Sequence, residues 1–573
     1  MNNKQTYRKM KRLIIILTMF VGFAMQAQAY DFQSGNLLYT INSIDPPTVI
    51  LVGHADGPAA QGALVIPETV TYEGTTYSVT IIGKRAFNGC GGLTGTLVIP
   101  NSVVEIKAAA FCDCVGFTGD LVIPNSVTKM NVDLSPEGSV PGAFENCTGF
   151  DGRLVLSDAL DTIGDARGGG CFSGCSNLTG ELVLPNTLAY IGGNAFAGCS
   201  GFTGTLVIPE SVMRINGLAF AYCTGIEGVV FPNVTVPFDK EDSLFSGCTG
   251  LTSITLPEGW TTTGDYTFAG CTGLREVRLP ESMRTIGMGC FEDCTNLASI
   301  NFPDGLDEIV IHAFLRCTGL SGTIVINAKR IYRLSFGSCT GIEHLVLGEH
   351  LDYISEAAFK DTNIEAMTVK AVVPPELDSS DIVYSWHFDR NLPVTVPCGT
   401  LGAYQNAEVW SGFSNMSEGV TDLFSAVSAD ENAGTVAVLK EATCKDRSVE
   451  VEAVPNPGYE FLYWEANGNQ VSTDNPYSFE LEEDTELVAV FSPDGMDETG
   501  QSFSVYPNPA KDLVRIEGLE PSEIQIYNAL GQMVNVTYGT NEISVRDLPK
   551  GVYLLRITDL NGSSFTRRVI VAR

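Results

Sequence analysis

The sequence has few of the residues that most metal sites and nucleic-acid-binding surfaces require. Five histidines are spread over 573 residues, and none stands in a close-ligand spacing such as His-Glu-x-x-His. There are 34 Lys and Arg residues against 67 Asp and Glu, a formal net charge of −33. Such a chain lacks the cations that neutralise phosphates, so we expect no nucleic-acid or anionic-lipid partner. The acidity indicates a highly soluble exported surface, with a specific cationic ligand as the alternative.

Signatures of catalysis are also missing. No Gly-x-Ser-x-Gly elbow, phosphate-binding glycine loop or EF-hand ligand run occurs in the sequence. The cysteines follow the spacing of a repeat and not that of a zinc site. We therefore predict no catalytic residue, no metal site, no cofactor and no enzymatic activity.

Long apolar runs are absent except at the N-terminus. Residues 1–29 combine a basic stretch with an apolar segment from Leu13 to Met25 and end in Ala-Gln-Ala. This is the pattern of a secretory signal peptide, and it predicts cleavage between Ala29 and Tyr30. The apolar segment is shorter than the roughly 20 residues that cross a bilayer, so we expect no membrane span in the mature chain.

What the sequence does have is one short block, Ala-Phe-x-x-Cys, that recurs with variations. Eleven of twelve copies carry cysteine three residues after the phenylalanine, and successive cysteines lie 22 to 33 residues apart, mostly 23 or 24. The repeat phenylalanines are Phe87, Phe111, Phe144, Phe172, Phe196, Phe220, Phe245, Phe268, Phe291, Phe314, Phe336 and Phe359. A period near 23 residues over this length predicts a solenoid, in which each unit buries its apolar residues against its neighbours.

A representative unit also contains a short strand that ends in proline, residues 297–303, Leu-x-x-Ile-x-Phe-Pro. Its alternating apolar residues should point inward, and the proline ends it. Early units have one more residue before the strand than later units. The early unit at residues 93–97 reads Leu-Thr-Gly-Thr-Leu, and the later unit at residues 251–254 reads Leu-Thr-Ser-Ile. We expect this residue to bulge at the turn and to leave the stacking register intact. Two longer insertions, 131–141 and 165–170, should form loops. Such loops often lie near a binding surface, and the alternative is neutral drift in a loop that tolerates extra residues.

The repeat cysteines have two interpretations. Stacked units lie roughly 4.8 Å apart, which is within the reach of a disulfide. Side chains of a stack point inward in parallel, however, which favours a column of buried free thiols. Cys171 and Cys290 stand where other copies have alanine, as expected for a position that needs a small residue. Cys398 and Cys444 lie outside the repeats, and the sequence does not assign their pairing.

One position of each strand lies between two inward-facing residues and should face outward. In six consecutive units it is valine, namely Val98, Val122, Val155, Val183, Val207 and Val230. In the later units it is Thr255, Arg278, Asn301, Val325, Val346 and Thr368. An exposed valine stripe of roughly 24 Å is a candidate binding patch, because soluble proteins rarely expose contiguous apolar surface. The alternative is that valine simply suits a β-strand.

Changes of composition divide the chain into seven regions, and we predict a mainly β fold class. The regions are a signal peptide at 1–29, an N-terminal cap at 30–80, the solenoid at 81–370, a C-terminal cap at 371–420, a small β module at 421–492, a linker at 493–500 and a C-terminal β-sandwich at 501–573. Both caps should cover the apolar ends of the solenoid. Tyr404 and Trp410 are expected to do so at its C-terminal end.

The repeat resembles a known family. The proline-ended strand, the Ile-Gly pairs at 191–192 and 286–287, and Ala-Phe-x-x-Cys are similar to the leucine-rich repeat of BspA-like surface proteins of anaerobic bacteria. The resemblance covers roughly half of the chain. It implies a leucine-rich repeat solenoid that adheres to host proteins or to other bacteria.

The two C-terminal regions have resemblances of their own. Residues 458–461, Gly-Tyr-Glu-Phe, followed by Trp464 are similar to modules related to the internalin B-repeat. The last region closely resembles the C-terminal sorting domain of the type IX secretion system of Bacteroidetes. The matching residues are Tyr506, Pro507, Asn508, Pro509, Gly531, Gly551 and Tyr553. This resemblance implies export across the outer membrane, removal of the domain and attachment to surface lipopolysaccharide.

Together these regions predict a secreted or outer-membrane-surface protein that binds a protein or glycan ligand on a host or bacterial surface. Its other expected partner is the type IX secretion machinery. Adhesion is the first hypothesis. The alternative is a glycan-binding or nutrient-capture component, in which aromatic residues of the 421–492 module, Trp464 among them, contact sugar. Packing inside the module is the competing role for those aromatics.

Overall fold

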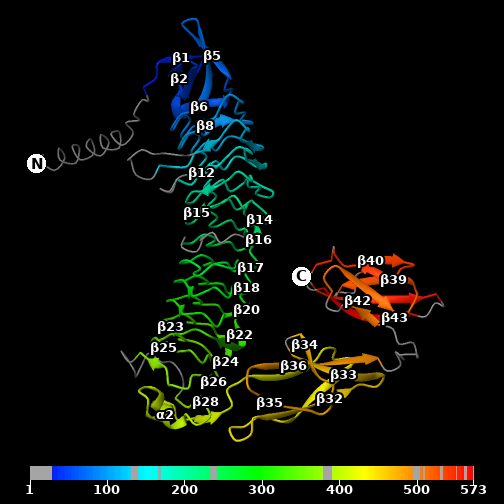
Figure 1. Ribbon diagram of the computed structural model, residues 1–573. Coiled ribbons are helices and arrows are strands. Elements are labelled where there is room, and N and C mark those ends of the chain that lie inside the picture. The colour runs from blue at the N-terminus through cyan, green and yellow to red at the C-terminus, as the bar shows by residue number, and fades with distance from the viewer. Residues whose placement is uncertain are drawn as a thin grey trace, which may run out of the picture. The chain divides into compact units, whose positions relative to one another are not determined.

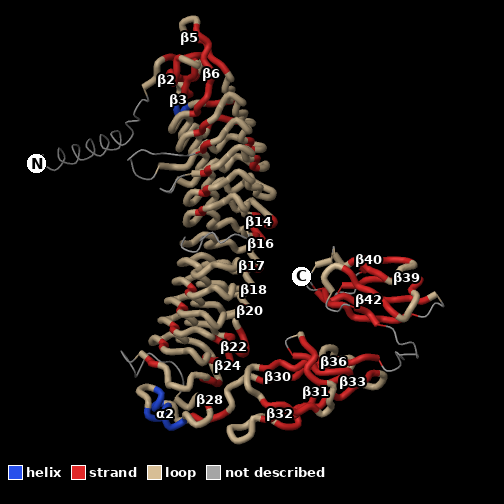
Figure 2. Tube along the Cα trace, in the orientation of Figure 1, coloured by secondary structure: helices blue, strands red, loops and turns tan. Residues whose placement is uncertain are grey.

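The computed structural model describes two units, Met1–Thr421 and Asp422–Arg573 (Figure 1). The described residues are 29–130, 140–164, 169–232, 242–378, 390–466, 468–493, 504–506, 510–528, 533–546, 548–549, 551–560 and 564–571. Strands and loops make up nearly all of them (Figure 2), which confirms the mainly β fold class. The predicted signal peptide, up to residue 28, and most of the two predicted insertions lie outside the described residues.

The first unit begins with a small β-structure. Its elements are β1 (Phe32–Ser34), β2 (Leu37–Ile44), β3 (Pro47–His54), the 3-10 helix η1 (Gly57–Ala59), β4 (Gln61–Ala63), β5 (Thr69–Tyr72) and β6 (Thr75–Ile82). Phe32 stacks against Tyr39 and Tyr72, with ring centroids 5.4 and 4.3 Å apart. β6 pairs in parallel with the first short strand of the repeats, so this structure shares one hydrophobic core with them.

Parallel strands from successive repeat units form two rows. The first row is β8 (Glu105–Ile106), β10 (Lys129–Met130), β12 (Thr162–Ile163), β13 (Tyr190–Ile191), β15 (Arg214–Ile215), β19 (Thr285–Ile286), β21 (Glu308–Ile309), β23 (Arg330–Ile331), β25 (Tyr353–Ile354) and β27 (Glu376–Leu377). The second residue of each of these strands is buried. One strand per coil, with neighbouring coils hydrogen-bonded, is the geometry of a solenoid.

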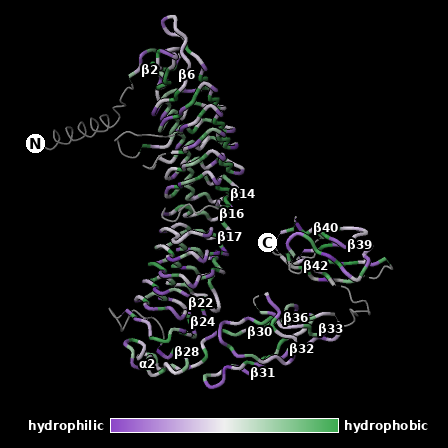
Figure 3. Tube along the Cα trace, viewed as in Figure 1, coloured by the Kyte–Doolittle hydropathy of each residue, from purple (hydrophilic) through white to green (hydrophobic). Residues whose placement is uncertain are grey.

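The second row contains the strand that ends in proline in many of the units. It consists of β7 (Gly92–Thr94), β9 (Leu121–Val122), β11 (Leu154–Val155), β14 (Gly204–Val207), β16 (Ile226–Val230), β17 (Ser253–Thr255), β18 (Glu276–Arg278), β20 (Ser299–Ile300), β22 (Ser321–Ile326), β24 (Gly341–Leu347), β26 (Ala366–Val369), β28 (Val394–Pro397) and β29 (Met416–Gly419). Apolar and polar residues alternate along the coils (Figure 3), as expected when one side of each strand is buried.

The repeat phenylalanines form one continuous stack inside the solenoid. All twelve are buried, and neighbouring rings lie 5.0 to 5.8 Å apart between centroids, nearly parallel. Offset stacking of this kind stabilises aromatic pairs beyond the area they bury. The Ala-Phe-x-x-Cys block therefore builds the interior.

The repeat cysteines form a second ladder beside the phenylalanines. In ten units the thiol donates to the backbone carbonyl of the phenylalanine one unit earlier, with Sγ–O distances of 3.0 to 3.2 Å. In the last unit Thr362 donates its hydroxyl to the carbonyl of Phe359 in the same unit, at 2.7 Å. The fourteen cysteines from Cys90 to Cys339 are buried free thiols, which confirms that interpretation over ladder disulfides.

Glycine after the repeat cysteine lets the coils approach closely. A Cβ at Gly201 would lie 2.3 Å from the carbonyl oxygen of Leu178, and one at Gly273 would lie 2.2 Å from that of Thr249. No side chain fits at those distances, so a larger residue would separate two coils. This explains the Cys-Thr-Gly and Cys-Ser-Gly sequences that follow many repeat phenylalanines.

The bulge predicted before the strand is present. The register shifts between Gly204 and Thr205 in the β14–β16 pair and between Gly322 and Thr323 in the β22–β24 pair. Gly204 has a φ of +77°, which favours glycine. Val207 still pairs with Val230 beyond the shift, so the expectation of an intact stacking register is confirmed.

At its C-terminal end the first unit has α2 (Leu401–Asn406), the one α-helix of the described residues, and the 3-10 helix η2 (Trp410–Gly412). The Tyr404 hydroxyl donates to the carbonyl of Ala371 at 2.6 Å, and Trp410 Nε1 donates to the carbonyl of Pro375 at 2.8 Å. Both aromatic side chains are buried against the end of the solenoid core.

The second unit contains two pairs of β-sheets. The first pair, the β module, has β30 (Phe424–Ser428), β33 (Tyr459–Ala466), β34 (Asn469–Ser472) and β36 (Thr485–Pro493) in one sheet and β31 (Gly434–Lys440), β32 (Ser448–Pro455) and β35 (Tyr477–Glu480) in the other. The second pair has β37 (Ser504–Tyr506), β38 (Leu513–Glu517) and β41 (Glu542–Ser544) in one sheet and β39 (Pro521–Asn528), β40 (Met533–Tyr538), β42 (Gly551–Asp559) and β43 (Ser564–Val571) in the other.

Candidate functional site

The strongest candidate site is a line of exposed valines on the outer face of the second row, which we call the valine ridge. Its members are Val65, Val98, Val122, Val155, Val183, Val207 and Val230, each between 44% and 77% exposed. The neighbours on either side, such as Leu97 and Ile99, are buried. The ridge therefore arises from strand alternation, and its side chains are open to a partner.

Val65 extends the ridge by one coil that sequence reasoning did not include. It is 77% exposed, and the preceding strand β4 pairs in parallel with β7. The signal was available, because residues 64–67, Leu-Val-Ile-Pro, repeat the strand sequence of residues 97–100. Over seven coils the ridge spans roughly six spacings of 4.8 Å, or about 29 Å.

Backbone hydrogen bonds between coils hold two parts of the ridge in place. Ile123 donates to the carbonyl of Val155 at 2.8 Å, and Ile208 donates to that of Val230 at 2.9 Å. Val122, Val155, Val207 and Val230 thus lie on strands that pair with a neighbouring coil. Their β-branched side chains have little rotamer freedom to lose on binding. A rigid surface of this kind binds with a small entropic penalty.

The same face changes towards the C-terminal end of the array. Thr255, Arg278 and Asn301 are exposed, whereas Val325 is half-buried. The expectation that Val346 and Thr368 also face solvent is wrong, because they are 0% and 8% exposed. The hydroxyl of Thr368 lies 2.9 Å from Nε2 of His344, so a neighbouring side chain covers this part of the strand.

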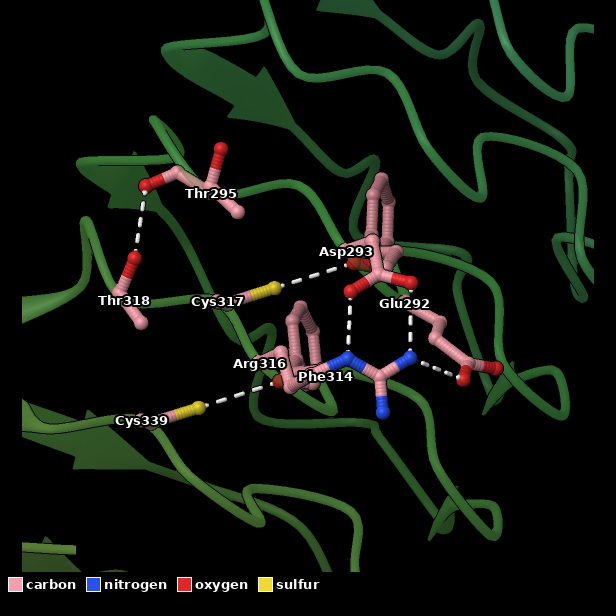
Figure 4. Close-up of polar contacts among 9 residues, drawn as sticks. Glu292, Asp293, Thr295, Phe314, Arg316, Cys317, Thr318 and Cys339 are labelled. Atoms are coloured by element: carbon pink, nitrogen blue, oxygen red, sulfur yellow. Dashed lines mark hydrogen bonds and ion pairs between the residues drawn. The ribbon is translucent and has the colours of Figure 1, made fainter.

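Ion pairs join successive coils at the turn that contains the repeat phenylalanine. Arg316 contacts Asp293 and Glu292 of the preceding coil, with Nη2–O distances of 2.7 and 2.8 Å (Figure 4). The hydrogen bond from Arg316 lowers the pKa of the Asp293 carboxyl. Figure 4 also shows the thiols of Cys317 and Cys339 in their contacts with the backbone of the preceding coils. These groups link successive coils, and none of them belongs to the valine ridge.

In the described part of the chain, no group of three or more His, Cys, Asp or Glu side chains has an arrangement that could hold a metal ion. Burial lowers the pKa of His344, and burial raises the pKa of Cys90 to about 11. A thiol with a raised pKa is a poor nucleophile at neutral pH. Among the described residues, no helix has the length and apolarity needed to cross a bilayer.

In the β module, Trp464 does not reach the surface. Its side chain is fully buried, and Nε1 donates to the carbonyl of Asp474 at 3.0 Å. The hypothesis that Trp464 contacts sugar is therefore wrong, and the competing packing role is the one the structure has. Tyr477 and Phe479 of β35 are only half-buried.

The residues of the predicted sorting motif are partly described. Tyr506 is exposed and donates its hydroxyl to Glu517 at 2.9 Å. Tyr553 is buried and donates to the carbonyl of Pro549 at 2.9 Å, while Gly551 begins β42. Pro507, Asn508, Pro509 and Gly531 lie outside the described residues. At the predicted signal cleavage site, Ala29 and Tyr30 are exposed, and the cleavage itself stays a prediction.

Comparison with protein families assigns three parts of the chain. BspA type leucine rich repeat regions match residues 70–134, 140–271 and 240–365, which together cover just over half of the chain. A secretion system C-terminal sorting domain matches residues 504–572, and a divergent InlB B-repeat domain matches residues 425–495. The sorting domain places the protein at the cell surface or outside the cell, by type IX secretion.

Individual proteins are similar over parts of the chain. A leucine-rich repeat protein from Bacteroides ovatus is 24% identical, with a TM-score of 0.43, over 68% of this chain and 100% of that one. A leucine rich cell surface protein from Faecalibacterium prausnitzii is 19% identical, with a TM-score of 0.39, over 60% of this chain and 95% of that one. Beta-agarase D of Zobellia galactanivorans is 30% identical over 96 residues, 17% of this chain. The chain spans about a fifth of the length of that relative.

Proposed function

Because the chain belongs to the family of BspA type leucine-rich repeat proteins, we propose that it is a surface-displayed binding protein that adheres to other proteins through the valine ridge. The observation that carries this proposal is the exposure of seven valines on consecutive hydrogen-bonded coils. Contiguous exposed apolar surface marks interaction sites in soluble proteins. The adhesive role is one of binding, and it requires no catalytic residue, metal or cofactor.

The test removes the apolar surface of the ridge and leaves its strands in place. The variant is Val122→Ser/Val183→Ser/Val207→Ser in the chain from Tyr30 to Arg573. Its binding to a panel of matrix and plasma proteins is measured by surface plasmon resonance. We expect the affinity for a bound member of the panel to fall about tenfold or more, since buried apolar anchors supply most of the energy of an interface. Thermal melting should change little, because these positions are exposed.

A matched control removes three exposed apolar residues from other parts of the array. Val104, Val115 and Met213 are 44%, 48% and 72% exposed and lie off the ridge, so Val104→Ser/Val115→Ser/Met213→Ser should bind as the parent chain does. Equal losses in both triple variants would contradict a role for the ridge. Saturable binding to a glycan panel, with none to any protein of the first panel, would replace adhesion by glycan capture.

A further inference from the structure

The β module has a recess that the valine ridge and the sorting sequence do not explain. It has a volume of about 460 Å³ and lies where β34, β35 and β36 meet the end of β33. Its inner surface includes Leu487, which is buried, and Ala466. A volume of this size is within the range of recesses that hold small ligands.

One wall of the recess is aromatic. Tyr477 and Phe479 occupy alternate positions of β35, so their side chains lie on the same face of the strand. Their rings stack with centroids 5.4 Å apart and planes 16° apart, and both are only half-buried. The face of an aromatic ring is negative, so it attracts a cation as well as an apolar group.

The rim of the recess is acidic. Glu480, Glu482 and Glu483 are exposed and border the recess, while none of its described lining residues is Lys or Arg. Arg447 contacts the carbonyl of Leu481 from nearby, but its charge is paired with Asp422. Three carboxylates without a lining cation give the rim an excess of negative charge. This charge attracts a cation and offers no such attraction to a neutral sugar.

From these observations we propose that the recess binds an organic cation, an alkylammonium or guanidinium group on an apolar stem. The stem contacts Leu487 and the two aromatic rings, and the charged head lies between the rings and the rim carboxylates. The same chemistry occurs in Lys and Arg side chains of a basic polypeptide and in free amines. The site goes beyond the proposed adhesion by the ridge and is independent of it.

The experiment measures the binding of a fluorescent hexa-arginine peptide to the chain from Tyr30 to Arg573 by anisotropy, at about 150 mM salt, where diffuse charge attraction is largely screened. The variant Glu482→Gln/Glu483→Gln should lose roughly three- to tenfold in affinity, as expected for two rim charges. The matched variant Glu431→Gln/Glu460→Gln removes the same charge from exposed positions of the module outside the recess. It should bind within about twofold of the parent chain.

Two ring variants separate the recess from general acidity. Tyr477→Phe keeps the aromatic face and should retain binding, whereas Tyr477→Ser should lose it while the melting transition of the second unit is retained. Competition by agmatine, a free guanidinium compound, would show that the isolated group suffices, and its failure alongside peptide binding would identify a polypeptide as the source. Equal losses in the two glutamate variants would overturn the proposal. So would binding of maltohexaose, a neutral sugar, at this site without binding of either cation.

Discussion

The earlier and the later coils of the solenoid share one kind of interior but differ on the outer face of the second row of strands. From Val65 to Val230 the outward position is valine on every coil, and we call these coils the valine half. On the next coils the position is Thr255, Arg278 and Asn301, and we call the coils from there on, with their ion pairs, the charged half. The phenylalanine stack and the thiol ladder continue through both halves without a change in kind. Stacking thus constrains the inward positions, and the outward positions are free to differ. The two halves therefore differ at positions that stacking does not constrain.

The second half has ion pairs between successive coils. Lys329 contacts Asp307 at 2.7 Å, and Arg330 contacts Glu308 at 2.8 Å, each across one coil. These residues are about one-third to one-half exposed, so each pair contributes little to stability in water. The two halves should accordingly be equally stable and differ in what they bind.

The largest expected effect comes from the shared interior. Phe196→Ala in the valine half and Phe291→Ala in the charged half should each lower the free energy of unfolding by about 3–5 kcal/mol, because each opens a cavity in the ring stack. Urea unfolding followed by circular dichroism measures both. A loss confined to one half would show that the two halves do not share an equivalent interior.

Smaller losses are expected where coils approach most closely. Gly201→Ala and Gly273→Ala place a methyl group 2.3 and 2.2 Å from carbonyl oxygens of the preceding coil. The strain should cost about 1–3 kcal/mol in either half. Gly402→Ala, in α2 and with no atom within 4 Å of the added carbon, is the control and should be neutral or slightly stabilising. Thermal melting distinguishes the three, and tolerance at both array glycines would contradict the close approach.

The thiols should make both halves sensitive to alkali. Burial raises the pKa of Cys90, in the valine half, to about 11 and that of Cys248, in the charged half, to about 12. A raised pKa means that the folded state holds its proton while the unfolded thiol releases it. Stability is therefore complete below about pH 9 and falls as pH rises towards these values.

Urea midpoints between about pH 8 and pH 11 measure this alkaline decline. The variants Cys90→Ala and Cys248→Ala should each make the decline shallower, since each removes one titrating thiol. A thiol reagent should label the array cysteines only after unfolding. Rapid labelling of the folded chain in one half alone would show that this half opens locally.

The smallest effect is expected at the ion pairs of the charged half. Arg316→Met should lower the free energy of unfolding by less than about 1 kcal/mol, because the pairs are partly exposed and screened by salt. Arg316 lowers the pKa of Asp293, so its contribution is present at neutral pH and is lost as pH falls. The control Arg278→Met breaks a pair within one strand and should change nothing measurable. A Tm difference that persists at acid pH would contradict an ionic origin.

Much of the fold could be predicted because its information is local and repeated. Twelve copies of one block define the period, and alternation around Leu97 and Ile99 defines which residues are inside. The bulge before the strand, seen at Gly204, could be predicted because early units have one extra residue there. Val65 was not included in the predicted stripe, whereas packing, one of the two roles considered for Trp464, was correct. Val65 lies in a partial repeat, and the burial of Trp464 depends on strands that are distant in the sequence.

By itself the sequence determined that this protein is a secreted solenoid with phenylalanine and cysteine inside and valine outside on its first coils. Only the tertiary structure decided that the thiols of ten units bond the phenylalanine carbonyl of the preceding coil and that Val346 and Thr368 are buried. It also decided that Tyr477 and Phe479 line an acidic recess. The physical reason is that a repeat specifies the direction of each side chain, whereas its partners are atoms of other coils and strands. Those partners come into reach only when the chain is folded.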